Sequence, residues 1–326
     1  MSIPTNRIKR ILVMRGGAIG DFVLTLPALK ALREAFPSAQ LDILGYKHIA
    51  AVAERRFYAD AVRSIEYGPL AGFFARSGDL DEELRNYFAS FDLVISYLYD
   101  PDGILRQNLE RSGVRHIVFG PATIRSGSHA THQLGRPVEQ IGVSVTDYVP
   151  RLFPAAEDVA FAREFVPGDS QIIAIHIGSG SPKKNWAVQH WLELGDSLLA
   201  TDGWSTLRRS LIVVSGEADE TELAAVKAHW ADNDVKFATN LPLPKLAAVL
   251  GQCVFIGHDS GISHVAAAAG AKSVVLFGPT DPGIWAPRGS DVRIIEAPNC
   301  DLSALPVAAV IEALGGWDSW TCHRNR

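Results

Sequence analysis

Residues Val254–Gly270 read VFIGHDSGISHVAAAAG, an apolar run that ends in a polar turn and continues as an alanine-rich segment. The pattern predicts a buried strand, a turn at Asp259–Gly261 and a helix. Asp259 or Ser260 can cap that helix by accepting from its first backbone N–H groups. Those N–H groups favour an anion, and Gly261 lets the backbone approach one closely. The turn is either an ordinary helix cap or a phosphate seat, to which His264 could add a proton donor.

The strand and helix pattern extends outward from this stretch through the second half of the chain. Its periodicity predicts further strands at Ile172–His176, Leu211–Ser215, Lys236–Thr239, Ser273–Phe277 and Val292–Ile295. Helices are expected at Val188–Ala200, Asp219–Trp230, Pro244–Leu250 and Val307–Leu314. This half therefore predicts a doubly wound α/β domain.

The first half opens in the same way. Its expected strands are Arg10–Met14, Leu41–Leu44, Val62–Tyr67, Leu93–Ser96 and His116–Val118. Its expected helices are Phe22–Phe36, Asp79–Phe88 and Gly103–Ser112, with a long polar loop at Pro121–His132. The two prolines of Tyr148–Pro154 suggest a linker, followed by a helix at Ala155–Phe165. We therefore expect two Rossmann-like domains, 1–152 and 153–326, with a cleft between them, and the last helix could pack back on the first domain.

Composition narrows the class of protein. The chain has 326 residues, 47% of them hydrophobic and 21% charged, which is typical of a globular protein with a sizeable core. Its net charge of −5, with acids and bases mixed, argues against nucleic acid as a partner. Three unpaired cysteines argue against a disulfide framework and fit a cytoplasmic location. Without a run long enough to span a membrane, any contact with the inner face of the cytoplasmic membrane would be peripheral.

The first glycine-rich turn, Arg15–Asp21, does not follow a known cofactor fingerprint. A dinucleotide motif aligned on Gly17 and Gly20 needs a glycine where Arg15 stands, and no Gly-Lys-Ser/Thr follows for a P-loop. The turn does place Asp21 at the start of a helix and at the carboxyl end of a strand. Asp21 is either an acid favoured by the helix dipole or a carboxylate, ionised near neutrality, that can accept a proton.

Other polar residues follow strands in the second half. Lys183 and Lys184 stand in a turn with Ser179 and Ser181. Two adjacent lysines are most often a solvated pair, but the serines also offer phosphate donors, so an anion site is the alternative. Three acids follow the next strand, where most such residues only cap a helix but one could hold a ribose hydroxyl: Glu217, Asp219 and Glu220.

The spacing His129-x-x-His132 would suit a metal, but no cluster of acids or cysteines accompanies it in the sequence. We therefore interpret this loop as a structural or acceptor-contacting segment, and we expect neither a metal nor a cofactor.

Three separated motifs resemble glycosyltransferase family 9, the lipopolysaccharide heptosyltransferases. They are Ile11–Asp21 with Leu26–Leu29, the Lys184-Asn185-Trp186 turn with His190-Trp191, and Asp259–Ala267 with Phe277–Thr280. The resemblance spans nearly the whole chain and is loose only over Tyr46–Arg136. It implies two facing Rossmann-like domains of the GT-B architecture, with the acceptor on the first and a sugar nucleotide on the second.

The resemblance also implies transfer of heptose from ADP-heptose, with inversion and without a metal, to a lipopolysaccharide core or related lipid-linked glycan. By position it makes Asp21 the general base and Lys184 a phosphate contact. The diphosphate seat becomes Asp259, Ser260, Gly261 and His264, and the ribose acid falls at Asp219 or Glu220. The alternatives are another sugar donor or acceptor on this scaffold, a nicotinamide-dependent oxidoreductase, or an inactive binding protein.

Overall fold

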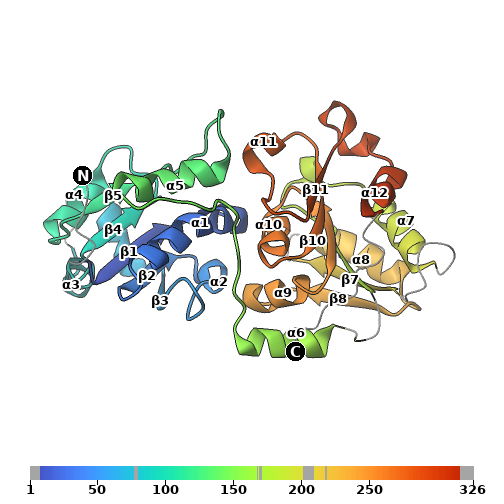
Figure 1. Cartoon of the computed structure of the whole chain (residues 1–326), viewed down its shortest axis with the longest axis horizontal. Coiled ribbons are helices and arrows are strands. Elements are labelled where there is room, and N and C mark those ends of the chain that lie inside the picture. Colours follow the sequence, from blue (N-terminus) through green and yellow to red (C-terminus); the bar gives the residue numbers. More distant parts are fainter. Residues whose placement is uncertain are drawn as a thin grey trace. The chain divides into compact units, whose positions relative to one another are not determined.

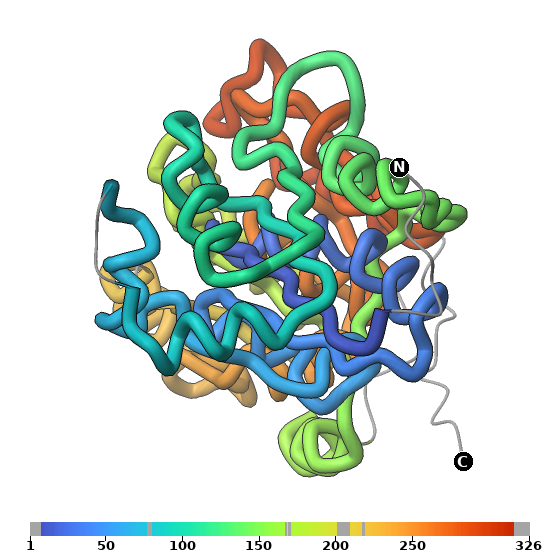
Figure 2. The backbone as a smooth tube through the Cα atoms, turned by 90° about the vertical axis from the view of Figure 1, so that its left-hand side faces the viewer, coloured from blue at the N-terminus to red at the C-terminus, as the bar shows by residue number. Residues whose placement is uncertain are grey.

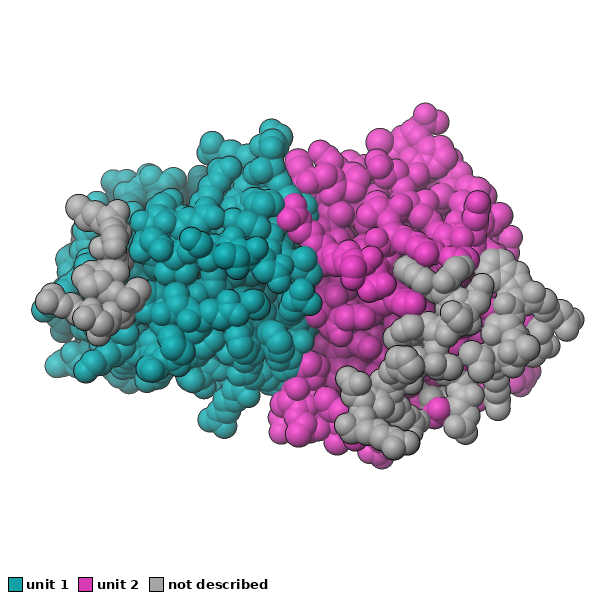
Figure 3. All heavy atoms as spheres, viewed as in Figure 1, with its two compact units in different colours: residues 1–153 teal, residues 154–326 magenta. Residues whose placement is uncertain are grey.

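The chain divides into two compact units, Met1–Phe153 and Pro154–Arg326, coloured separately in Figure 3. The computed structural model describes residues 8–76, 80–166, 168, 171–200, 209–216 and 219–315. Each unit is built on its own parallel sheet, so the predicted α/β class with two Rossmann-like domains is confirmed (Figure 1).

Unit 1 holds a five-stranded sheet in the order β3-β2-β1-β4-β5, with every pair parallel. Its strands are β1 (Arg10–Arg15), β2 (Gln40–Gly45), β3 (Ala61–Ser64), β4 (Leu93–Ser96) and β5 (Ile117–Phe119). Its helices are α1 (Ile19–Ala35), α2 (Lys47–Ala50), α3 (Glu82–Ala89), α4 (Ile104–Arg111) and α5 (Ala130–Gln140), with a 3₁₀ segment η2 at Gly68–Phe74. Figure 2 shows this part of the chain in blue to green.

The core of unit 1 follows from the alternation of side chains along its central strand. Leu12 and Met14 of β1 join Phe73, Phe88 and Leu109 in one buried cluster, which packs the sheet against η2, α3 and α4. The intervening residues Ile11 and Val13 are also fully buried, as expected of a parallel strand covered on both faces.

Unit 2 holds a six-stranded parallel sheet in the order β11-β10-β9-β6-β7-β8. Its strands are β6 (Gln171–His176), β7 (Arg209–Ser215), β8 (Val235–Thr239), β9 (Val254–His258), β10 (Lys272–Phe277) and β11 (Val292–Glu296). Its helices are α6 (Ala156–Phe165), α7 (Val188–Leu199), α8 (Glu220–His229), α9 (Leu243–Leu250), α10 (Gly261–Ala268), α11 (Pro282–Trp285) and α12 (Val307–Leu314). Short 3₁₀ segments are η3 (Pro182–Lys184), η5 (Pro298–Cys300) and η6 (Leu302–Ala304).

Large aromatic side chains fill the core of unit 2. Trp186, Trp191 and Trp230 pack with strand residues such as Ile175 and Ile256 between the sheet and helices α7, α8 and α12. The last helix, α12, contacts α7, β10 and β11 of its own unit.

Several element boundaries differ from the sequence prediction. Helix α1 begins at Ile19 rather than Phe22, so Asp21 is its third residue. Helix α5 was missed because Gly135 and Pro137 lie inside it and weaken the helical pattern. The predicted loop Pro121–His132 is therefore wrong over its last three residues, which form the first turn of α5.

Candidate active site

The residues predicted to carry chemistry follow strands that lie where the strand order of each sheet reverses. In unit 2, β6 lies beside β9, and the chain builds outward from this pair on both sides. In unit 1, β1 and β4 form the corresponding pair. Open parallel sheets bind ligands at the carboxyl ends of such strand pairs. The turns after β1, β6 and β9 carry Asp21, Lys184 and Asp259, so each unit brings its candidate residues to the expected edge.

Lys184 is held by an ion pair within unit 2. Its Nζ lies 2.6 Å from Oδ2 of Asp259, and the Thr280 hydroxyl donates to the same oxygen over 2.6 Å. The Asp259 side chain is buried, whereas 29% of the Lys184 side chain is exposed. The neighbouring Lys183 is exposed. The structure therefore separates the two lysines: Asp259 and Thr280 fix Lys184, with part of its side chain still accessible.

The turn after β9 starts helix α10 as the sequence predicted. Ser260 is the N-cap, and its Oγ accepts from the backbone N–H of Ser263 over 3.4 Å. Gly261 opens the helix, and His264 is buried in its first turn. A helix start with glycine at its first position offers backbone donors to an anion. The chemistry of this turn suits a phosphate.

A buried histidine connects three of these turns. His176 ends β6, and its Nδ1 lies 3.3 Å from Oγ of Ser260. Its Nε2 lies 3.8 Å from Oδ2 of Asp219, which accepts from the backbone N–H of Gly216 over 2.8 Å. Burial lowers the pKa of His176 to about 4, so the ring is neutral at pH 7. This histidine was not singled out from the sequence, where nothing marks a strand-end histidine as a link between turns.

The two acids proposed for the ribose lie in different environments. Asp219 is buried, and a Cβ added to Gly178 would overlap its carboxylate. Glu220, the first residue of α8, is exposed. Glu217 lies outside the described residues. Glu220 is thus accessible to a ligand, while the Asp219 carboxylate is already occupied by backbone and histidine neighbours.

Ser179 and Ser181, the two serines in the turn that carries Lys184, also differ in their hydrogen-bond partners. Oγ of Ser179 lies 2.9 Å from the carbonyl oxygen of Ser181 and 2.5 Å from Oδ1 of Asn185. The Ser179 hydroxyl therefore shapes the turn from within. Ser181 precedes η3 and is half-buried.

In unit 1, Asp21 is fixed by the turn that precedes it. Its Oδ2 accepts from the backbone N–H of Ala18 over 3.0 Å, and its Oδ1 lies 3.3 Å from the Arg15 guanidinium. Arg15 is buried and also donates to Thr25 Oγ1 and to the carbonyl oxygen of Asp21. Burial lowers the pKa of Arg15, and the charge of Asp21 opposes that change. About a third of the Asp21 side chain stays exposed.

The glycines of this turn serve its geometry. Gly17 has a φ of +93°, and a Cβ there would lie 2.8 Å from Oδ2 of Asp21. Gly20 is the second residue of α1, directly before Asp21. Gly17 thus leaves room for the carboxylate to reach the Ala18 amide.

The two histidines of the predicted acceptor-side loop lie at the start of α5. His129 is buried and caps the helix, with its Nδ1 accepting from the backbone N–H of Thr131 over 3.2 Å. His132 lies inside the helix, and its ring centroid is 3.8 Å from that of Tyr148. Both residues therefore hold the helix in place, and His132 is not part of a loop.

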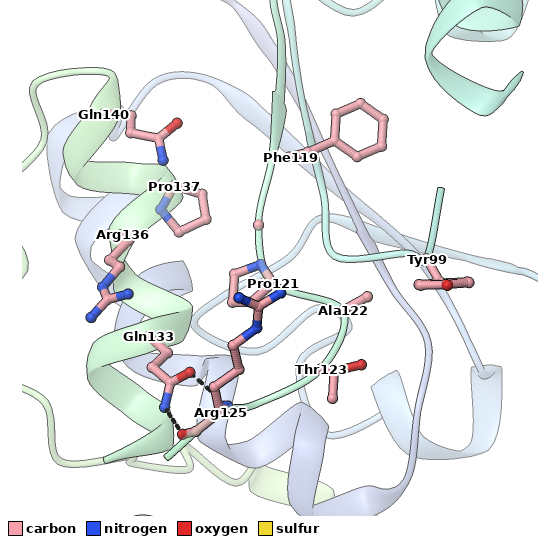
Figure 4. Close-up of a pocket in the computed structure, with 11 residues that line it drawn as sticks. Tyr99, Phe119, Pro121, Ala122, Thr123, Arg125, Gln133, Arg136, Pro137 and Gln140 are labelled. Atoms are coloured by element: carbon pink, nitrogen blue, oxygen red, sulfur yellow. Dashed lines mark hydrogen bonds between the residues drawn. The ribbon is translucent and has the colours of Figure 1, made fainter. Parts of the chain in front are cut away.

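Unit 1 also contains a cavity of about 380 Å³ that the sequence did not indicate (Figure 4). It lies at the carboxyl ends of β4 and β5, the same edge of the sheet that carries Asp21. Arg125 and Arg136 line it, and among the residues described there none is acidic. Its lining residues are Tyr99, Phe119, Gly120, Pro121, Ala122, Thr123, Arg125, Gln133, Arg136, Pro137 and Gln140.

The walls of this cavity are fixed by two devices. Gln133 donates to the Arg125 carbonyl oxygen and accepts from its backbone N–H, which ties the loop to α5, as the dashed lines in Figure 4 show. A Cβ on Gly120 would overlap the ring of Tyr97, so glycine is required for the loop to leave β5. The lining includes two arginines and Tyr99, a residue that is 75% exposed. Such a lining suits an anionic, ring-shaped ligand.

In the part of the chain that the structure describes, no group of three or more His, Cys, Asp and Glu residues is placed to hold a metal ion. Within the same ranges, no helix combines the length and apolarity needed to cross a bilayer.

Two parallel α/β units, one of them with a turn suited to an anion, define a fold but not an activity, which comparison with known proteins supplies. The model of glycosyltransferase family 9 (heptosyltransferase) matches residues 121–304. The chain belongs to this family and is a glycosyltransferase. This membership removes the nicotinamide-dependent oxidoreductase from the alternatives.

Curated relatives cover most of the chain. Lipopolysaccharide heptosyltransferase 1 of Pseudomonas aeruginosa is 27% identical, covering 86% of this chain and 81% of its own. The enzyme of the same name from Escherichia coli K12 is 24% identical, covering 94% and 99%.

Solved structures share the fold. A glycosyltransferase family 9 protein from Veillonella parvula aligns with a TM-score of 0.76 at 21% identity, covering 94% of this chain and 96% of its own. Escherichia coli heptosyltransferase WaaC with ADP aligns with a TM-score of 0.67 at 21% identity, covering 94% and 98%.

Proposed function

We propose that this glycosyltransferase transfers heptose from ADP-heptose to a lipopolysaccharide core or a related surface glycan. The observation that carries the proposal is the partly accessible lysine, Lys184, held beside the start of α10 at the switch point of the second sheet. Relatives named lipopolysaccharide heptosyltransferase, and a related structure that contains ADP, support the donor and the acceptor class.

The donor is proposed to bind unit 2. Backbone N–H groups at Gly261 and the Lys184 ammonium would hold the diphosphate, while Glu220 would accept from a ribose hydroxyl. Asp259 would act indirectly, since a carboxylate repels a diphosphate but attracts the lysine that binds it. The positive charge of Lys184 would stabilise the leaving ADP, on which negative charge grows in the transition state.

The acceptor is proposed to bind unit 1, with Asp21 as the general base. Asp21 would take the proton of the acceptor hydroxyl. At the same time the oxygen of that hydroxyl would form the new bond to the anomeric carbon. The bond from that carbon to the diphosphate oxygen breaks at the same time, and ADP leaves with the electron pair. Attack opposite the leaving group inverts the anomeric configuration, and Lys184 supplies the charge that a metal ion would otherwise supply.

The cavity of unit 1 is proposed to receive an anionic group of the acceptor. Arginine presents a planar fork of donors that matches carboxylate and phosphate oxygens. Arg106 lies 4.6 Å from the centroid of the Phe119 ring, which adds a third guanidinium near this cavity. If the acceptor is lipid-linked, the enzyme would meet it peripherally at the inner face of the cytoplasmic membrane.

A donor panel tests the proposal. Thermal shifts with ADP-heptose, other ADP-sugars, UDP-sugars and NAD, followed by transfer assays with and without EDTA, should single out ADP-heptose and show activity without added metal. Stabilisation by a UDP-sugar alone would indicate another donor on the same scaffold. Loss of transfer in EDTA that magnesium or manganese restores would refute the metal-free mechanism.

A further inference from the structure

His258, the last residue of β9, bonds both ends of the turn that carries Lys184. Its Nε2 accepts from the backbone N–H of Trp186 over 2.7 Å, and its Nδ1 lies 3.2 Å from the carbonyl oxygen of Gly178. These two residues bracket the segment 178–186, which we call the lysine turn. The imidazole therefore closes this turn at its base.

The two bonds fix the state of the ring. A backbone N–H can only donate, so Nε2 must be unprotonated where it meets Trp186. A carbonyl oxygen can only accept, so Nδ1 must carry the proton where it meets Gly178. Only the neutral Nδ1–H tautomer satisfies both partners. Burial agrees with this, because the side chain is fully enclosed and its pKa is lowered to about 3.

The surroundings leave the ring little freedom. The Trp191 ring meets it edge to face, with centroids 5.1 Å apart, and Ser263 donates its hydroxyl to the His258 carbonyl oxygen. Trp186 is itself anchored, since its Nε1 donates to the carbonyl oxygen of Leu305 over 3.0 Å. His258 thus joins a rigid core to the turn.

The next residue in the chain completes the arrangement. Asp259 holds the Lys184 ammonium at 2.6 Å, while His258 holds the backbone of the turn at both ends. Two adjacent residues at the end of one strand therefore determine both where the turn lies and where its lysine points.

We infer that His258 is a positioning residue that acts through Lys184, by clasping the lysine turn so that the ammonium stays at the donor diphosphate. The inference rests on the proposed role of Lys184. The link from His258 to the lysine turn does not depend on that role; it requires only the Nδ1–H tautomer and the bonds to Gly178 and Trp186.

Two amide variants separate the bonds. Asparagine places an amide near the position of Nδ1 and keeps only the bond to Gly178, whereas glutamine can place an oxygen near Nε2 and keeps the bond to Trp186. His258→Asn should lower kcat by about 10-fold to 10²-fold, as loss of a supporting partner does at other sites, with little change in the KM of the acceptor. His258→Gln should recover part of this loss.

A double-mutant cycle then tests the route of the effect. If His258 acts through Lys184, adding His258→Asn to Lys184→Ala should cost less than about 3-fold more in kcat, because the lysine is already gone. In the matched Lys183→Ala background, the full effect of His258→Asn should persist. Losses that multiply in both backgrounds would overturn the inference.

Measurements that do not depend on catalysis separate the role of His258 in the lysine turn from the proposed role of Lys184. In donor-free protein, amide hydrogen exchange over 179–185 should rise in His258→Asn, and ring nitrogen NMR of the parent should report the neutral Nδ1–H tautomer. An unchanged exchange pattern or the opposite tautomer would overturn the clasp. If these readouts hold but Lys184→Ala turns over normally, the proposed function of Lys184 fails instead.

Discussion

Lys184 Nζ and Asp259 Oδ2 lie 2.6 Å apart although 75 residues separate them in the chain. Parallel pairing of β6 with β9 brings their turns together, and Thr280 after β10 adds a second contact to the same carboxylate. The cation of the candidate donor site is therefore aligned before any ligand arrives, which limits the ordering cost of binding and of reaching the transition state.

Replacement of Lys184 should reveal this role. Lys184→Ala should lower kcat by roughly 10²-fold, by analogy with the loss of one oxyanion donor. Lys183→Ala is the matched control, because that side chain is exposed, and it should stay within about 3-fold of the parent. Steady-state transfer kinetics with both variants decide the matter; equal losses would mean that the wrong lysine has been assigned.

The ribose contact should belong to Glu220 rather than Asp219. Loss of a hydrogen bond to a charged group costs about 1.5–3 kcal/mol, so Glu220→Gln should weaken ADP binding by about 10-fold or more. Asp219→Asn should mainly lower thermal stability, since its carboxylate is buried among Gly216, Gly178 and His176. Calorimetric titration with ADP measures both. If ADP binds more weakly to Asp219→Asn and with unchanged affinity to Glu220→Gln, the ribose contact belongs to Asp219 instead.

The fold could be predicted because its signals are local. Apolar runs, glycine turns and helical spacing lie within short stretches, and the start of α10 at Gly261 follows directly from the Asp-Ser-Gly turn. The site contacts are not local: the bonds of His258 to Gly178 and Trp186 span 80 and 72 residues. Arg15 was missed for a different reason: it lies only six residues from Asp21, but nothing in the sequence shows that its side chain is buried and turned toward that carboxylate.

The cavity of unit 1 predicts charge-dependent acceptor binding. Arg125→Ala and Arg136→Ala should each raise the KM of an anionic acceptor, because each removes a guanidinium from the lining. We expect about 10-fold for each variant, with unchanged affinity for ADP. Arg115→Ala, an exposed arginine outside the cavity, is the control. Acceptor kinetics that resemble this control would place the acceptor elsewhere.

Two buried histidines predict an acid-sensitive unit 2. Burial lowers the pKa of His176 to about 4 and of His258 to about 3, whereas both titrate near 6.5 when unfolded. As pH falls from about 6.5 toward 4, the unfolded chain binds more protons than the folded one. Stability is therefore full above this window and falls within it, by up to about 1.4 kcal/mol per pH unit for each histidine.

Urea unfolding at pH 7, 6 and 5 measures this slope. All seven tryptophans lie after residue 153, so their fluorescence reports on unit 2. His258→Gln should flatten the slope, whereas His116→Gln, at an exposed position in unit 1, should leave it unchanged. A slope that stays steep in His258→Gln would assign the acid sensitivity to other groups.

Asp21 carries the proposed mechanism, and its environment allows a clean test. In Asp21→Asn, the amide oxygen can still accept from the Ala18 N–H, and Arg15 keeps its bonds to Thr25 and to the backbone carbonyl. The fold should therefore change little, while the loss of a general base should slow transfer by about 10²–10⁴-fold. ADP affinity should be unaltered, since the donor seat is proposed on unit 2. Transfer rate and calorimetric affinity should be measured on the same preparation: unchanged transfer would reduce Asp21 to a helix-start residue, and lost ADP binding would assign it to the other substrate.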